Sequence, residues 1–117
     1  MRWAEGLQSY NAKLFFMSNL TFKEFQEFIR TNYYKYDSQR GTAGTFMWLM
    51  EEIGELASAL QKCSLKEPSP DEERNLKEEF ADVLGWLSTL ANMHNVDLEE
   101  AVRLKYLNNK DLHGHKG

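Results

Sequence analysis

Apolar residues recur along this chain at spacings of three and four, the period of a helix with one buried face. No segment alternates apolar and polar residues for long, and the Asn-Gly and Asp-Gly pairs that favour hairpins are absent. We therefore expect an all-α fold, an antiparallel bundle of about four helices. At this chain length, we expect a second copy of the chain to complete the apolar core.

Capping residues and turn residues predict where the helices begin and end. The pattern predicts four helices: one from near Thr21, one over 45–63, one over 70–94 and one after Asp97. Thr21 and Glu24 fit a capping box, and Ser69 precedes a proline at the first turn of the third helix. Residues 37–44 have turn chemistry and predict a loop. The predicted core stripe of the second helix is Phe46, Leu49, Ile53, Leu56 and Leu60.

The 117 residues are enough for one domain. We expect a helical domain over 21–110, an extension or extra helix over 1–20, and a flexible tail over 111–117. Met17 is an alternative native start. The single cysteine excludes an internal disulfide framework, and no apolar run approaches the roughly 18 residues that span a bilayer. A cytoplasmic protein without membrane contact is the default expectation.

The net charge of −4 hides an uneven distribution. Residues 51–100 hold 13 acidic and 4 basic side chains, a balance of −9, and the rest of the chain carries +5. Such an acidic segment is a poor surface for nucleic acid, so we expect no nucleic-acid partner. It can attract cations, and a solvated acidic helix face is the alternative.

Two acidic pairs lie at the edges of apolar helix faces. On a wheel of about 100° per residue, Glu52 and Glu55 flank the stripe that contains Leu49. Glu79 and Asp82 flank the stripe of the next helix in the same way. If the two helices run antiparallel, Glu55 faces Glu79. Glu52 then faces Asp82, and four carboxylates can converge in one small volume.

Four converging carboxylates repel one another strongly unless a cation neutralises them. Carboxylate oxygens without histidine or cysteine favour a hard cation, Mg²⁺ first and Mn²⁺ second. A di-iron centre would call for Glu-x-x-His pairs, which this chain lacks. The acidic pairs therefore predict a magnesium site, with exposed, solvated acids as the alternative.

The order and spacing of these acids resemble those of the MazG-like nucleotide pyrophosphohydrolases, in the all-α NTP pyrophosphatase superfamily. The motif of that family is Glu-Glu-x-x-Glu, followed after a spacer by Glu-x-x-Asp. It reads here as Glu51-Glu52-Ile-Gly-Glu55 and Glu79-Phe-Ala-Asp82. The resemblance covers residues 20–110 or so. It implies that the metal ligands are Glu52, Glu55, Glu79 and Asp82. Glu51 is the expected supporting acid or water-orienting base.

The resemblance also implies substrate contacts outside the acidic motif. The family tends to place a lysine, and an asparagine four residues later, on its last helix, and Lys105 and Asn109 match. Arg40 is a further candidate for contact with phosphate oxygens. Trp48 and Trp86 either wall the base or sugar site or pack in the core or dimer interface.

The activity that the resemblance implies is Mg²⁺-dependent cleavage of a nucleoside triphosphate to a monophosphate and pyrophosphate. Such enzymes remove non-canonical or surplus nucleotides, and they work as homo-oligomers, here a homodimer or homotetramer. Phosphoribosyl-ATP pyrophosphohydrolysis is a related alternative. A non-catalytic helical module, whose acidic face binds a basic partner, is the alternative from a different class.

Overall fold

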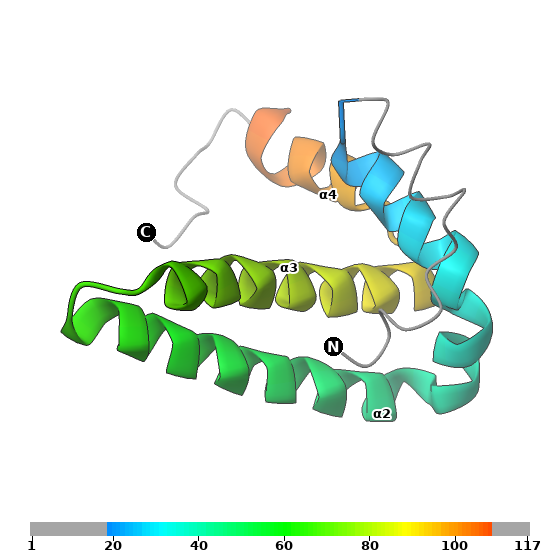
Figure 1. Cartoon of the computed structure of the whole chain (residues 1–117). Helices are drawn as coiled ribbons and strands as arrows, with labels where there is room; N and C mark the ends of the chain where they lie inside the picture. Colours follow the sequence, from blue (N-terminus) through cyan, green and yellow to red (C-terminus); the bar gives the residue numbers. More distant parts are fainter. Residues whose placement is uncertain (1–18, 109–117) are drawn as a thin grey trace.

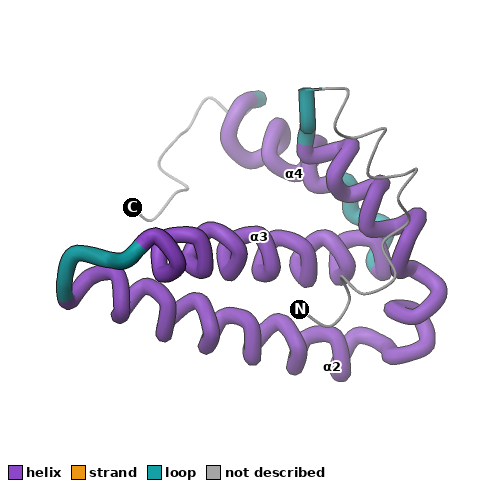
Figure 2. Tube along the Cα trace, in the orientation of Figure 1, coloured by secondary structure: helices purple, strands orange, loops and turns teal. Residues whose placement is uncertain are grey.

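The structure, a computed structural model, describes residues 19–108, and the regular elements of this part are all helical (Figure 2). In chain order they are α2 (Phe22–Leu65), α3 (Pro70–Met93), α4 (Leu98–Val102) and the π-helix η2 (Arg103–Leu107). The predicted all-α class is confirmed. The expected N-terminal helix and C-terminal tail fall outside the described residues. In residues 19–108, no helix has the length and apolar character needed to span a bilayer.

α2 begins where the sequence predicts but continues much further. Thr21 and Glu24 form the capping box, each side chain accepting from the backbone N–H of the other. The predicted loop over 37–44 is too long, because the residues on both sides of Gly41 are helical and only Gly41 leaves helical geometry, at φ +82° and ψ 171°. Two helical arms of α2 meet at this residue. A polar residue beside it forms a local hydrogen bond: the Thr45 hydroxyl donates to the backbone carbonyl of Gly41 at 2.8 Å. The turn residues therefore produce a bend in α2 instead of an open loop.

The second arm of α2 and the whole of α3 form an antiparallel hairpin (Figure 1). Ser69 caps α3 as predicted, with Pro70 in the first turn and Glu72 completing the capping box. The first arm of α2 turns back at Gly41 and passes across the end of α3, where α4 lies beside it (Figure 1). The hairpin is the part of the fold that carries both acidic pairs.

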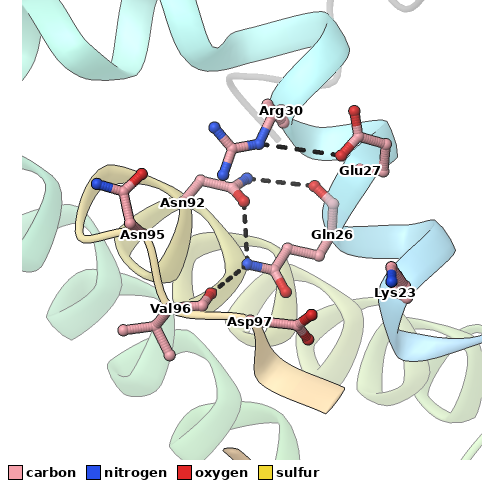
Figure 3. A pocket seen from close by; sticks show the side chains of 8 residues that line it. All are labelled: Lys23, Gln26, Glu27, Arg30, Asn92, Asn95, Val96 and Asp97. Carbon is pink, nitrogen blue, oxygen red and sulfur yellow. Dashed lines mark hydrogen bonds and ion pairs between the residues drawn. The ribbon is translucent and has the colours of Figure 1, made fainter. Parts of the chain in front are cut away.

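A buried pair of amide side chains ties the first arm of α2 to the end of α3 (Figure 3). Gln26 Nε2 donates to Asn92 Oδ1 at 3.0 Å and to the Val96 carbonyl at 2.6 Å. Gln26 Oε1 accepts from the backbone N–H of Leu98, and Asn92 Nδ2 donates to the Gln26 carbonyl. Because each of these buried amides has partners, the cluster fixes the arm and the start of α4 without leaving a polar group unsatisfied.

The face of α2 that meets α3 is rotated from the predicted core stripe. Its buried side chains in the hairpin are Thr45, Leu49, Glu52 and Ala59. Of the predicted stripe, Leu49 is buried, but Phe46, Ile53 and Leu60 are 40–49% exposed. A helical wheel shows that α2 has an apolar stripe, but it does not show which edge of that stripe packs against α3. The outer edge remains uncovered in the single chain.

Candidate metal centre

Three carboxylates from the two helices of the hairpin meet at one point. One oxygen each of Glu52, Glu55 and Glu79 lies within 4.8 Å of the other two. Glu52 and Glu55 come from successive turns of α2, and Glu79 comes from α3. The i, i+3 spacing brings side chains to one helix face, and the antiparallel packing of the hairpin brings the two faces together.

Asp82 lies next to these three residues, one turn further along α3. Its side chain interacts with Glu52, and the side chain of Glu79 interacts with Glu55. These are the two cross-helix pairs that the wheel predicts. Burial is the main cause that raises the pKa of the Asp82 carboxyl, and it raises the pKa of Glu79 as well.

Glu52 is the most deeply enclosed member of the cluster, with 3% of its surface exposed. Burial first, and then the negative charges of the neighbouring acids, together raise the pKa of its carboxyl to about 7. One carboxylate oxygen of Glu52 and one of Glu79 are buried and form no hydrogen bond with the described residues. Within residues 19–108, no lysine or arginine forms an ion pair with any of the four acids.

The donor set fits a hard divalent cation. Several carboxylate oxygens converge, two of them buried without a partner, and no cationic side chain from the described residues balances their charge. Oxygen-rich sites of this kind suit Mg²⁺ or Mn²⁺, and a cation would remove the repulsion that raises the pKa of Glu52. The cluster, built on the α2–α3 hairpin, is therefore a candidate metal centre.

Two tryptophans and an arginine form a second cluster beside the acids. Trp48 precedes Glu52 by one turn and Trp86 follows Asp82 by one turn. The two rings stack with centroids 6.4 Å apart and planes 18° from parallel. Trp86 is 2% exposed, so Trp48, half-buried, is the member of the pair that reaches the surface. The guanidinium of Arg40 lies over the Trp86 ring, 5.0 Å from its centroid.

Comparison with known proteins agrees with this arrangement. A family model, the MazG nucleotide pyrophosphohydrolase domain, matches residues 40–110, which is more than half of the chain. The chain belongs to the MazG family. The matched range contains both acidic pairs, so the carboxylate cluster lies inside the family domain.

Two relatives extend the comparison. The crystal structure of iMazG from Vibrio DAT 722 is 30% identical and superposes with a TM-score of 0.60, covering 84% of this chain and all of the iMazG chain. The uncharacterized protein YvdC from Bacillus subtilis is 38% identical over 64 residues. That match spans 48% of this chain and 60% of YvdC, so the chain covers less than two thirds of this curated relative.

The remaining predicted site residues of this MazG domain lie apart from the carboxylates or outside the described chain. Glu51 is exposed on α2, one residue before Glu52. Lys105 is exposed on η2, which continues directly from the end of α4 at Val102. Asn109 lies outside the described residues. A π-helical turn such as η2 is rare and often found at functional sites, which makes the position of Lys105 notable.

Sequence reasoning missed one buried acid near the site. Asp37 is 2% exposed and forms an ion pair with Arg40, between Oδ1 and Nη1 at 3.1 Å. The i, i+3 spacing of this pair is a helical signal, but the predicted loop over 37–44 concealed it. A continuous helix through this segment would have placed the two side chains on one face.

Proposed function

We propose that this MazG domain is a Mg²⁺-dependent nucleotide pyrophosphohydrolase. It cleaves a nucleoside or deoxynucleoside triphosphate between the α- and β-phosphates, giving the monophosphate and pyrophosphate. The observation that carries the proposal is the convergence of Glu52, Glu55 and Glu79 on one point, with buried oxygens that lack hydrogen-bond partners among residues 19–108. Its biological use would be the removal of non-canonical or surplus nucleotides.

The four carboxylates would hold the metal ion, with Mn²⁺ as a substitute for Mg²⁺. When bound, the ion supplies charge neutralisation at the phosphates and lowers the pKa of water. The hairpin holds Glu52 and Glu79 in place, because both lie mid-helix and are at least half-buried. Glu51, exposed at the rim, would orient or deprotonate the attacking water from outside the ligand set.

The substrate would bind through its base on one side and its phosphates on the other. Trp48 is half-buried one turn from the acids, and the buried Trp86 stacks against it. Lys105 and Asn109 would meet phosphate oxygens. Because Lys105 is exposed on η2, we propose that assembly of the protein brings these two residues to a carboxylate cluster.

The assembly we propose is a homodimer or homotetramer. The exposed apolar stripe of α2 has spacings of four, three, four and three, the heptad pattern of a helix that packs along another helix. It consists of Phe46, Met50, Ile53, Ala57 and Leu60. On α3, Phe80 and Leu87 are 54% and 45% exposed. A second hairpin would cover these side chains and so complete the core.

The test is incubation of the purified protein with a panel of canonical and modified nucleoside triphosphates, with Mg²⁺ or with EDTA. Products are separated so that monophosphate and pyrophosphate are distinguished from diphosphate and phosphate. We expect Mg²⁺-dependent formation of monophosphate and pyrophosphate. Glu79→Gln should lower kcat at least about a hundredfold, because it removes a charged ligand from the site.

Glu78→Gln is the matched control. Glu78 directly precedes Glu79, is exposed, and pairs only loosely with Arg74 at 3.8 Å. Glu78→Gln should retain activity within about threefold, since single surface charges contribute little.

Phosphoribosyl-ATP is included in the panel of nucleotides. Turnover of that nucleotide alone would reassign the substrate. No turnover of any nucleotide by a folded, assembled protein would favour an interaction module instead.

A further inference from the structure

The Arg40 side chain is held in place from several directions where α2 bends. Its Nη1 donates to Asp37 Oδ1 at 3.1 Å and to Thr45 Oγ1 at 3.2 Å. The Thr45 hydroxyl uses its own hydrogen to donate to the Gly41 carbonyl, so its oxygen is available as an acceptor. Thr45 is fully buried. The bend at Gly41 thus brings together two acceptors that hold the guanidinium in one position.

The partner of Arg40 is an unusually buried acid. The Asp37 side chain is 3% exposed, against 23% for Arg40. Burying a carboxylate costs free energy, which Arg40 and the buried Thr89 offset in part; burial still raises the pKa of the Asp37 carboxyl. The pair therefore contributes more to holding Arg40 in one orientation than an exposed i, i+3 pair would.

The stem of Arg40 passes so close over Gly44 that a side chain there would have to push it aside. A Cβ atom at Gly44 would lie 2.9 Å from Arg40 Cγ and 3.5 Å from Cδ. The absence of a side chain at Gly44 gives the arginine its path toward α3. The path ends over the ring of Trp86, where a planar cation is attracted by the ring face.

This chain of contacts reaches the metal centre through the tryptophan pair. Arg40 covers Trp86, Trp86 stacks on Trp48, and each tryptophan stands one helical turn from a carboxylate of the cluster. Trp86 has almost no contact with solvent. Its orientation is therefore decided by its protein neighbours, and among the described residues Arg40 places a cation over its ring.

We propose that Asp37 and Arg40 are positioning residues: Asp37 holds the Arg40 guanidinium over Trp86, and this contact sets the orientation of the Trp48–Trp86 pair against which the substrate base packs. The last step rests on the proposed function, because only a nucleotide substrate brings a base. Arg40 acts through the aromatic pair in this arrangement and does not bind phosphate.

Near-UV circular dichroism measures the arrangement of the pair directly. The near-UV signal of the Trp48–Trp86 pair is the difference between the spectrum of the wild-type protein and that of Trp48→Phe. Arg40→Lys keeps the charge but loses the planar group, so it should remove at least about half of that signal. Arg30→Lys is the matched control, because Arg30 also pairs with an acid three residues earlier and lies over a tyrosine ring at 5.4 Å. A pair signal unchanged in folded Arg40→Lys overturns the proposal.

Two further variants test the same proposal if Arg40→Lys does not fold. Gly44→Ala pushes the Arg40 stem aside without changing a polar group, and Asp37→Asn removes the charge that anchors the guanidinium. Each should reproduce the loss of pair signal while far-UV circular dichroism stays unchanged. Retention of the full pair signal in both variants contradicts the proposal.

Kinetics separate a positioning residue from a phosphate contact. Arg40→Lys should raise KM for the triphosphate about tenfold and change kcat less than about threefold. Inhibition by the nucleoside monophosphate should weaken to the same degree, whereas inhibition by pyrophosphate, which has no base, should not change. Weaker inhibition by pyrophosphate would make Arg40 a phosphate contact and overturn the proposal. If the wild-type protein has no turnover, the proposed function fails, while the dichroism still decides whether Arg40 orders the pair.

Discussion

Glu52 combines nearly complete burial with three acidic neighbours. Its pKa rises from 4.5 to about 7 in the folded protein, first through burial and then through the nearby negative charges. Between these two values the unfolded chain has lost the proton and the folded protein keeps it. The free energy of unfolding of the metal-free protein therefore falls as the pH rises through this window.

We expect this residue to make the stability of the protein depend on both pH and metal. In EDTA, wild type should lose on the order of 1–3 kcal/mol relative to Glu52→Gln between pH 5 and pH 8. Mg²⁺ at pH 8 should restore the stability of wild type but not change that of the variant, since the variant lacks a charged ligand. Urea unfolding with and without Mg²⁺ measures both effects. The same pH slope in the two proteins would show that the carboxyl group of Glu52 is not the cause.

At the scale of the elements, α2 consists of two helical arms that meet at Gly41. Gly41 has the φ of +82° and ψ of 171° that only glycine adopts readily, and its neighbours on both sides are helical. The bend turns the first arm back over α3, where the Gln26 and Asn92 amides hold it. It also places Arg40 over the aromatic pair, so the backbone conformation of one residue affects both the packing and the site.

Two glycines of α2 allow a matched test of this bend. A Cβ atom would meet nothing within 4 Å at either Gly41 or Gly54, so an added methyl group changes only the backbone preference. Gly41→Ala should lower the free energy of unfolding by about 1–3 kcal/mol, because alanine is strained at this φ and ψ. Gly54→Ala lies inside regular helix and should raise it by about 0.5–1 kcal/mol. Urea unfolding gives both values, and equal effects would contradict a conformational origin.

At the scale of the whole molecule, residues 19–108 leave many large apolar side chains exposed. The buried apolar side chains of the described residues are Ile29, Tyr33, Leu49, Ala59, Trp86 and Ala91. Larger side chains such as Phe46, Ile53 and Phe80 keep 40–54% of their surface exposed along the hairpin. Exposed apolar residues in a helical register mark a contact surface, and the proposed second copy of the chain fits it.

A charge inserted in this stripe should therefore separate the copies. Ile53→Glu should weaken self-association more than about tenfold, because assembly would bury an unpaired carboxylate. Met47→Glu is the control on the same helix, since Met47 is 72% exposed and lies off the stripe. Size-exclusion chromatography with light scattering reads the result. A monomeric wild-type protein, or equal assembly in both variants, would rule out this face as the interface.

The sequence by itself determined the features that depend on residues close together along the chain. The capping boxes at Thr21 and Ser69 follow from contacts over three residues, and the structure confirms both. The acidic pairs follow from the helical period, and once the helices pair antiparallel Glu55 must approach Glu79. For this reason the motif of a metal centre could be read before any fold was known.

The tertiary structure decided which faces meet. Nothing local shows that 37–44 stays helical, because its turn residues are compatible with a loop until Asp37 is buried against Arg40 and Thr89. Likewise, the apolar stripe of α2 is wide enough for two partners, and only the packing of α3 shows that Phe46 and Ile53 are left for another surface. Burial depends on residues distant in sequence, whereas capping and periodicity depend on residues a few positions away.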